Sequence, residues 1–282
     1  MPTEQTENNQ KLRDAKKKEM ERQFLDGFRD EEIGVYREMF SAKSQIEGQD
    51  GGIVTTLLLK GIHENIFDVA IVVHRKKEYN AEVIAATTKE EILAAKGTIY
   101  YRINVTKKLR ELLAQGKTRI AVVGTSCEVT AVRKLQQTLS KNIEITVIGL
   151  FCFGAFNPQK LQEKTKAQLG IDLNKATKIQ IKQGKFSVYV DNKEHYCKIK
   201  DISEASERIC SFCNDFVSRL ADISIGSTTN RTGYSTVIVR SKKGTTLVSN
   251  LDVKKKEADR QGIAKLVQLK REQAKRANHN PP

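Results

Sequence analysis

The sequence predicts an α/β fold in which helices flank a mixed β-sheet, with a β-hairpin and a cysteine-bearing segment in the C-terminal part. Three observations in the 282 residues support this prediction. Apolar runs alternate with helix-like segments between residues 52 and 152, a period-two segment follows at 175–201, and Cys210 and Cys213 stand three positions apart. Alternating strands and helices are typical of layered α/β proteins, which bind ligands at the carboxyl ends of their strands.

The expected elements follow in order along the chain. Strands are predicted where apolar residues run or alternate, over 67–75, 81–88, 118–125, 143–152, 221–227 and 235–241. Helices are predicted from helical spacing over 52–62, 88–97, 105–117, 128–139 and 157–170. Thr88 is a candidate N-cap, and Gly97 and Gly170 are candidate C-caps. Residues 175–201 alternate about a Gly-Lys turn, which predicts a hairpin.

The composition is that of a globular protein, with 39% hydrophobic and 29% charged residues. No run approaches the roughly 18 apolar residues of a membrane span, and the polar N-terminus lacks the apolar centre of a signal peptide. We therefore expect a cytoplasmic protein without a membrane span. In that reducing compartment, five cysteines indicate metal or thiolate chemistry rather than a disulfide framework.

The formal net charge of +15 raises the question of a nucleic-acid partner. Aromatic residues make up only 6% of the chain, and no segment alternates basic with aromatic residues as a stacking surface would. A nucleic-acid partner is therefore disfavoured, and the basic surface suits an anionic cofactor. The four histidines are scattered without a neighbouring nucleophile, which disfavours hydrolysis.

Four of the five cysteines lie where the predicted fold can bring them together. Cys127 and Cys152 end two successive predicted strands, and Cys210 and Cys213 precede a third. Four thiolates in a tetrahedral arrangement suit a zinc ion or an iron–sulfur cluster. Cys127 and Cys152 are also explained as small buried apolar residues. Spacing alone leaves all three interpretations open and favours the cluster.

Three glycine-bearing turns accompany the cysteines. Gly51 and Gly52 open an apolar helix, Gly124 and Thr125 follow a buried strand, and residues 225–236 are rich in hydroxyl groups. Backbone N–H groups at such openings bind anionic groups, although a single glycine is more often only a turn. The sequence has no G-x-G-x-x-G motif after a strand and no P-loop. Together the turns and cysteines indicate a nucleotide-bearing redox cofactor.

Seven stretches occur in the order found in one protein family. They are GQDGGIVTTLL, KGTIYYRINV, AVVGTSCEVTAVRKLQ, IGLFCFGAFN, IKQGKFSVYV, CSFCNDFVSRLADISIGS and GYSTVIVR. From about Gln49 to Arg240 the chain resembles the coenzyme F420-reducing hydrogenase beta-subunit family. This resemblance implies a mixed α/β fold with a cluster-binding C-terminal part. It also implies that the protein binds FAD and a 4Fe-4S cluster.

The resemblance also implies roles for individual residues. It makes Cys127, Cys152, Cys210 and Cys213 the ligands of one 4Fe-4S cluster and leaves Cys197 without a role. It also implies that the residues around the flavin are Gln49, Asp50, Gly51, Gly52, Thr98, Tyr100, Thr125, Ser126, Gly226 and Ser227. Coenzyme F420, a deazaflavin, would be the substrate, exchanging a hydride with the flavin. No catalytic residue is assigned.

Charge, the predicted elements and the resemblance together divide the chain into four expected parts. A charged tail or helix (1–30) precedes an α/β flavin-binding part (31–157), a hairpin and iron–sulfur part (158–251) and a charged C-terminal helix or tail (252–282). The added ferredoxin-like segment of some family members is missing, so a partner subunit or ferredoxin is expected to exchange electrons. A homo-oligomer stays open. The alternatives are a non-catalytic, metal-stabilised binding protein and a family member with another substrate.

Overall fold

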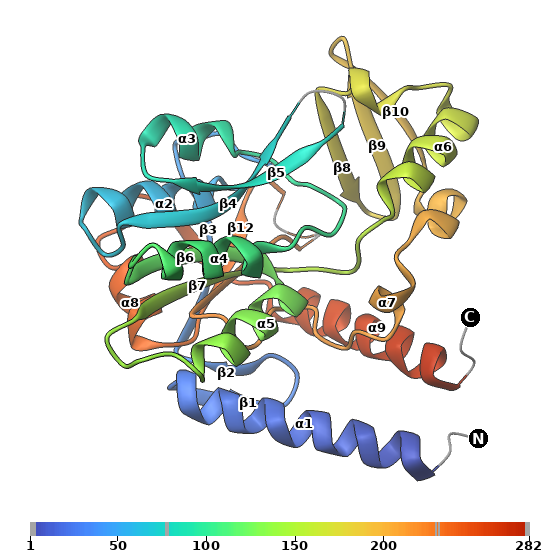
Figure 1. Cartoon of the computed structure of the whole chain (residues 1–282). Coiled ribbons are helices and arrows are strands. Elements are labelled where there is room, and N and C mark those ends of the chain that lie inside the picture. Colours follow the sequence, from blue (N-terminus) through green and yellow to red (C-terminus); the bar gives the residue numbers. More distant parts are fainter. Residues whose placement is uncertain (1–3, 77–78, 229, 231, 280–282) are drawn as a thin grey trace.

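The computed structural model describes residues 4–76, 79–228, 230 and 232–279. Among these residues, eight strands form one mixed sheet in the order β13-β3-β12-β11-β7-β6-β4-β5 (Figure 1). Neighbouring strands β4, β6, β7 and β11 are parallel. The antiparallel steps from β11 to β12 and from β12 to β3 turn β3 back into the same direction. Five strands therefore present their carboxyl ends at one edge of the sheet.

The strand bounds agree with the sequence over most of this sheet. They are β3 (Glu38–Lys43), β4 (Val69–Arg75), β5 (Ala81–Ala86), β6 (Arg119–Thr125), β7 (Glu144–Leu150), β11 (Ile223–Gly226), β12 (Ser235–Val239) and β13 (Lys254–Glu257). A short ribbon of β1 (Phe28–Asp30) and β2 (Gly34–Tyr36) precedes β3. The strands β3 and β13 were not predicted, whereas the other six overlap the predicted ranges.

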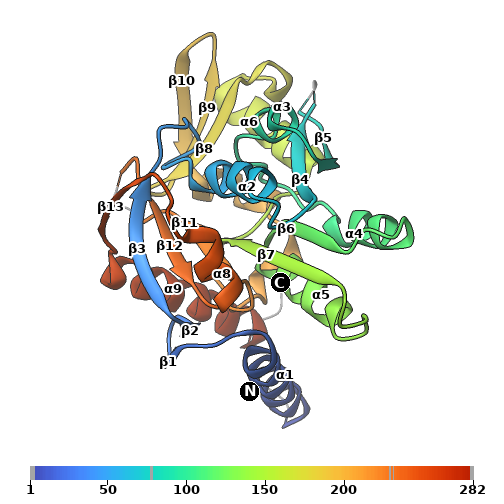
Figure 2. The same cartoon turned by 90° about the vertical axis from the view of Figure 1, so that its left-hand side faces the viewer.

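Helices cover both faces of the sheet (Figure 2). One face packs against α2 (Ile53–His63), α3 (Lys89–Ala94) and α8 (Lys242–Val248). The other packs against α4 (Val105–Ala114), α5 (Ser126–Gln136), the end of α1 (Glu4–Phe24) and α9 (Arg260–His279). Strand β12 illustrates the division, because Val237 and Val239 enter the first core and Ile238 enters the core under α9. The predicted α/β class is confirmed.

A small antiparallel sheet stands beside the large one, at the upper right of Figure 1. The predicted hairpin is present as β8 (Lys178–Lys182) and β9 (Lys185–Val190), and a second turn adds β10 (Lys193–Lys198). With α6 (Pro158–Leu169), these strands enclose their own core, which includes Phe156 and Phe186. Short helices η1 (Leu173–Lys175), η2 (Ile199–Ala205) and α7 (Arg208–Ser211) complete the connections.

Several predicted boundaries change. Helix α3 ends at Ala94 with Ala95 as its C-cap, so Gly97 is not the cap, whereas the Thr88 and Gly170 caps are confirmed. Helix α5 begins at Ser126 rather than 128, because Thr125 and Glu128 form a capping box. The helix thereby takes in Cys127, which was expected at a strand end.

The two charged ends are helical where the structure describes them. Residues 1–30 were expected to be a frayed helix or tail, and α1 covers Glu4–Phe24 with Met20 buried against the core. The large sheet takes strands from three of the four predicted parts of the chain, and the division itself stays a prediction. Residues 1–3 and 280–282, and two positions of the 225–236 turn, 229 and 231, lie outside the described residues. None of the described helices is long and apolar enough to cross a membrane.

Candidate cofactor site

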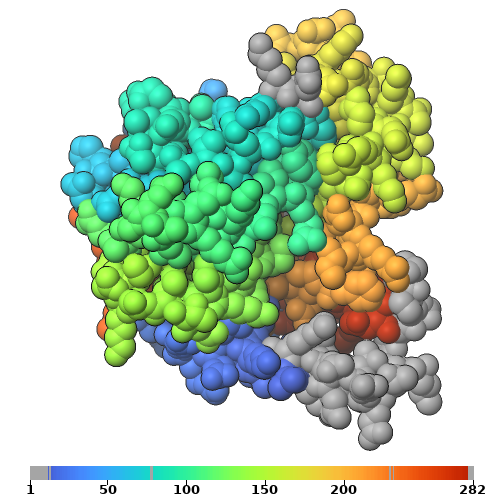
Figure 3. All heavy atoms as spheres, in the orientation of Figure 1, coloured from blue at the N-terminus to red at the C-terminus, as the bar shows by residue number. Residues whose placement is uncertain are grey.

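Most of the predicted site residues lie at the carboxyl edge of the large sheet. The loop after β3, the start of α5 after β6, and the segments after β7 and β11 all begin there. The Phe151 N–H donates to the Ile225 carbonyl at 2.8 Å, which joins the ends of β7 and β11. In space-filling view, a hollow opens between the segment of α7 and the body of the molecule (Figure 3).

The segment after β7 and the C-x-x-C segment are held together by their backbones. The Cys152 N–H donates to the Phe216 carbonyl at 2.9 Å, and the Glu207 N–H donates to the Ala155 carbonyl at 2.8 Å. A side-chain carbon at Gly154 would lie 3.6 Å from Cβ of Cys210, so the two segments touch beside the cysteines. This contact brings three of the four predicted ligands to one place.

Cys127 joins this group from the first turn of α5. Its thiol lies 3.4 Å from Thr125 Oγ1 and is exposed. Burial, together with the charges of Cys127, Cys210 and Cys213, raises the pKa of the Cys152 thiol to about 12. All three thiols are therefore close enough to act on Cys152. We call these four residues the cysteine site, and Cys197 lies apart from it on β10.

The cysteine site is not spaced for a single ion. In the part of the chain that the structure describes, no three His, Cys, Asp or Glu side chains form a group that could hold one metal ion. Among the described residues, the hydrogen bonds of the Cys152 and Cys213 thiols are long, at 3.8 Å to the carbonyls of Gly154 and Asp215. The protein's own hydrogen bonds therefore place few demands on these sulfur atoms.

Residues 49–52, the glycine loop, follow β3 at the same edge. The Gly51 N–H donates to Ser235 Oγ at 3.1 Å, and the Gly51 carbonyl accepts from the Ser44 N–H at 2.8 Å. Gly52 has φ +72° and caps α2, and a side-chain carbon there would collide with the Ile46 carbonyl oxygen. Close contacts within the chain are therefore sufficient to explain why glycine occupies positions 51 and 52.

Polar side chains converge between the glycine loop and the small sheet. Ser227 Oγ donates to Asp50 Oδ2 at 2.6 Å, and Gln49 Nε2 donates to the Ile179 carbonyl at 3.2 Å. The Tyr100 hydroxyl accepts from the Ile181 N–H at 3.1 Å.

Tyr100 connects this group to Asp50 and Thr98. Burial raises the pKa of Tyr100 to about 12, with hydrogen bonds to Ile181 and Thr98 lowering it and the Asp50 charge raising it. Thr228 Oγ1, next to Ser227, is buried and has no hydrogen-bond partner among the described residues. An unpaired buried hydroxyl at this edge is a polar group that a ligand can satisfy. We call Asp50, Tyr100, Ser227 and Thr228 the polar mouth.

The remaining predicted residues are already bonded within the protein. Thr125 Oγ1 donates to Glu128 Oε2 at 2.9 Å in the helix cap, and Ser126 Oγ lies 3.0 Å from Ser218 Oγ. A side-chain carbon at Gly226 would collide with the Phe151 ring, so Gly226 joins the polar mouth to the segment that carries Cys152.

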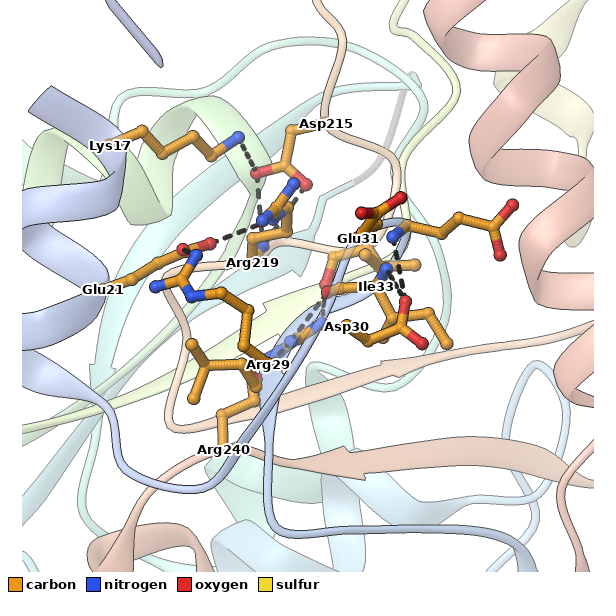
Figure 4. Close-up of polar contacts among 12 residues, drawn as sticks. Lys17, Glu21, Arg29, Asp30, Glu31, Ile33, Asp215, Arg219 and Arg240 are labelled. Carbon is orange, nitrogen blue, oxygen red and sulfur yellow. Dashed lines mark hydrogen bonds and ion pairs between the residues drawn. The ribbon is translucent and has the colours of Figure 1, made fainter. Parts of the chain in front are cut away.

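The sequence did not point to the buried charged residues that support the C-x-x-C segment of the cysteine site. Asp215 is buried, accepts an ion pair from Lys17 at 2.8 Å and is approached by the Arg219 N–H (Figure 4). Arg240 is fully buried and donates to the carbonyls of Ile33, Val35 and Val217. Burial raises the pKa of Asp215, but Lys17 and two arginines outweigh it and keep that pKa below its usual range. Of these residues, only Asp215 could have been suspected from the sequence, because it lies beside the C-x-x-C segment.

Two family descriptions match this chain over most of its length. The beta-subunit N-terminal region of coenzyme F420 hydrogenase/dehydrogenase matches residues 39–110, and the C-terminal region matches residues 117–261. The chain belongs to this family. The resemblance seen in the sequence is thereby confirmed, and the F420 hydrogenase/dehydrogenase beta-subunit family connects the chain with F420-linked electron transfer.

Individual relatives agree with that assignment. A coenzyme F420-dependent sulfite reductase of Methanocaldococcus jannaschii is 32% identical over 87% of this chain, which spans 42% of that protein. A coenzyme F420 hydrogenase subunit beta of Methanothermobacter thermautotrophicus is 30% identical over 88% of this chain and 95% of its own length. A chain of the F420-reducing NiFe hydrogenase complex from Methanosarcina barkeri matches with a TM-score of 0.83 at 29% identity, over 89% of this chain and 94% of that chain.

Proposed function

We propose that this chain is a flavin- and iron–sulfur-dependent subunit of an F420-linked oxidoreductase. The cysteine site would hold a 4Fe-4S cluster, the polar mouth and glycine loop would hold FAD, and coenzyme F420 would be the substrate. The observation that carries the proposal is the meeting of four thiols from three separate segments at the edge where the polar mouth also opens.

The chemistry of the thiols supports a cluster over a single zinc ion. Zinc–sulfur bonds of about 2.3 Å bring four thiolates within about 4 Å of one another, and no group of that kind occurs among the described residues. Thiols that act on one another electrostatically without single-ion spacing suit a group with several metal atoms. The weak contacts of the Cys152 and Cys213 thiols leave both sulfur atoms available for ligation.

The polar mouth supports a large polar cofactor. Thr228 offers a buried hydroxyl with no hydrogen-bond partner in the described part of the chain, and Ser227 and Asp50 are hydrogen-bonded to each other beside it. The contact from the half-buried Tyr100 to β8 fixes one wall, because the Tyr100 hydroxyl accepts a hydrogen bond from the Ile181 N–H. The glycine loop contributes shape rather than a free Gly51 N–H, since that donor is bonded to Ser235.

When bound, a flavin supplies the exchange between two-electron hydride chemistry and one-electron transfer, which a deazaflavin and a cluster need in order to communicate. The chain's own contribution is to hold both groups at one edge of a rigid sheet. Phe151, which contacts Gly226 and precedes Cys152, joins the two binding regions. A partner subunit or ferredoxin would exchange electrons at the cysteine site, as the hydrogenase complexes of the relatives suggest.

The test is the cofactor content of protein purified without oxygen. We expect iron, sulfide and flavin in the wild type, loss of iron in Cys127→Ser, Cys152→Ser, Cys210→Ser and Cys213→Ser, and wild-type iron in Cys197→Ser. Iron that survives all four single substitutions would contradict the cluster assignment. A colourless protein containing zinc would favour the second candidate, a non-catalytic protein that keeps a structural metal and binds partners through its basic surface. Flavin without F420 reduction would indicate a family member with another substrate.

A further inference from the structure

The two terminal helices lie mostly outside the residues that match the family, and both contact segments of the cysteine site. Helix α1 ends before residue 39, where the matched region begins, and α9 continues 18 residues past 261, where it ends. In Figure 1, α9 lies beside α7, and α1 runs below α9 along the same lower side of the molecule. Each helix sends one lysine to a segment that carries a proposed ligand.

Lys270 of α9 is fully buried and binds both cysteine segments at once. Its Nζ donates to the Phe153 carbonyl at 2.6 Å and to the Cys210 carbonyl at 2.8 Å. A third contact, to Gln273 Oε1 at 3.3 Å, uses the remaining N–H of the ammonium group. Because Phe153 follows Cys152 directly, Lys270 ties the segment after β7 to the C-x-x-C segment.

Lys17 of α1 acts on the other side of the C-x-x-C segment. Its Nζ lies 2.8 Å from Oδ2 of the buried Asp215, which stands two residues after Cys213 (Figure 4). Glu21, one turn further along α1, pairs with Arg219 at 3.0 Å and so fixes the same segment again. The N-terminal helix is thereby locked against the chain that follows Cys213.

Both lysines also bring positive charge to the cysteine segments. Lys270 Nζ contacts the carbonyl of Cys210 and that of Phe153, the residue after Cys152. Lys17 Nζ contacts the carboxylate of Asp215, two residues after Cys213, and this negative charge offsets part of the Lys17 charge. In a buried site, a fixed ammonium group stabilises negative charge more strongly than it would in water.

We propose that Lys270, assisted by Lys17, is a positioning residue that holds the two cysteine segments together and favours electron uptake at the cysteine site. Adding one electron to a group bound by four thiolates makes the site more negative, and a buried ammonium group favours that change. This inference rests on the proposed cluster. It assigns a role to the terminal helices, which lie almost wholly outside the residues of the family match.

The test compares Lys270→Met with Lys275→Met, an equal loss of charge at an exposed position of α9. Iron content and the midpoint potential of the iron–sulfur signal are measured in the purified chain. We expect a more negative potential or a lower iron content in Lys270→Met, a smaller shift in the same direction in Lys17→Met, and wild-type values in Lys275→Met. Lys270→Arg, which keeps the charge, should recover part of the potential.

A second measurement is independent of bound metal. In metal-free protein, amide hydrogen exchange of residues 152–155 and 208–213 should be faster in Lys270→Met than in the wild type or Lys275→Met. Wild-type exchange rates together with an unchanged potential in Lys270→Met would overturn the proposal. If the Lys270→Met chain does not fold, the same two measurements on Lys17→Met decide. A wild-type chain without iron would contradict the proposed function, and the exchange rates would still test whether Lys270 holds the segments.

Discussion

The cysteine site and the glycine loop lie at one edge of one sheet, but the protein uses their polar groups in opposite ways. In the glycine loop, the Gly51 N–H and carbonyl and the Asp50 carboxylate all have partners within the chain. At the cysteine site, the backbone is bonded, while the hydrogen bonds of the Cys152 and Cys213 thiols to the residues that the structure describes are 3.8 Å long. The glycine loop is complete as it stands, whereas the sulfur atoms are not used by the fold.

This difference separates the effects that substitutions should have. A larger residue in the glycine loop collides with the protein itself, so it acts on folding first and on any ligand second. A cysteine replaced by serine leaves the backbone contacts in place and removes only what the sulfur atom binds. Loss of a bound cofactor is therefore informative at the cysteine site and ambiguous at the glycine loop.

The largest effect is expected for Gly52→Val. A side chain at φ +72° costs about 1–2 kcal/mol, and the collision with the Ile46 carbonyl adds about 1–3 kcal/mol. We expect a lower thermal unfolding temperature even in protein stripped of cofactors. Gly116→Val is the matched control, because Gly116 has φ +80° but open space around its Cα. Equal stability of the two variants would show that the glycine loop tolerates a side chain and would restore a ligand-binding reason for Gly52.

Removing iron should have the next largest effect. Because a group that binds only the folded chain adds its binding free energy to stability, we expect the free energy of unfolding to fall by about 3 kcal/mol. Far-ultraviolet circular dichroism should hardly change, since backbone contacts such as that from Cys152 to Phe216 persist. The Cys197→Ser variant should respond to iron removal as the wild type does. Unfolding of the sheet on iron removal would contradict the view that the fold does not use the thiols.

The smallest effect is expected from titrating Tyr100. Its pKa is raised from 10.0 to about 12, so the folded state holds the proton more tightly than the unfolded state does. The resulting stabilisation is fully present below pH 10 and is lost as the pH rises from 10 to 12. Ultraviolet absorption of the phenolate, compared with Tyr100→Phe, measures this step. Asp50→Asn should lower the pKa of Tyr100, because the Asp50 charge raises it. An unchanged pKa would show that Asp50 and Tyr100 do not interact within the polar mouth.

The sequence predicted the regular elements of the sheet well because their signals are local. The runs at 67–75, 118–125 and 143–152 became β4, β6 and β7 with small changes at the ends. Strands β3 and β13 gave no such signal. The residues of β3 pair with Ser235–Val239 about 200 positions away, and β13 is composed of Lys and Glu at the edge of the sheet. These segments form strands because the rest of the sheet packs and pairs with them, and not because of their own local sequence.

The site was predictable to the same extent. Four cysteines could be selected because two end predicted strands and the other two share a short spacing before a third strand, and the structure brings them together. Lys270 could not be selected, because one lysine in a charged helix resembles the others until the fold buries it. Ser235 is likewise an ordinary strand residue until the glycine loop reaches it. The binding of FAD, the cluster and F420 stays a prediction from family membership and geometry.

The hydrogen bond from Gly51 to Ser235 has a consequence for the order in which the protein is made. These two residues are 184 positions apart. Among the described strands, β3, which leads into the glycine loop, pairs with β12, which begins at Ser235, and with β13, which follows it. A ribosome that adds about 5–20 residues per second needs roughly 10–40 s to pass from one to the other. During that time the nascent chain carries a glycine loop with no partner strand. Flavin added to stalled chains that end before residue 235 should therefore not be retained, whereas chains released at full length should retain it.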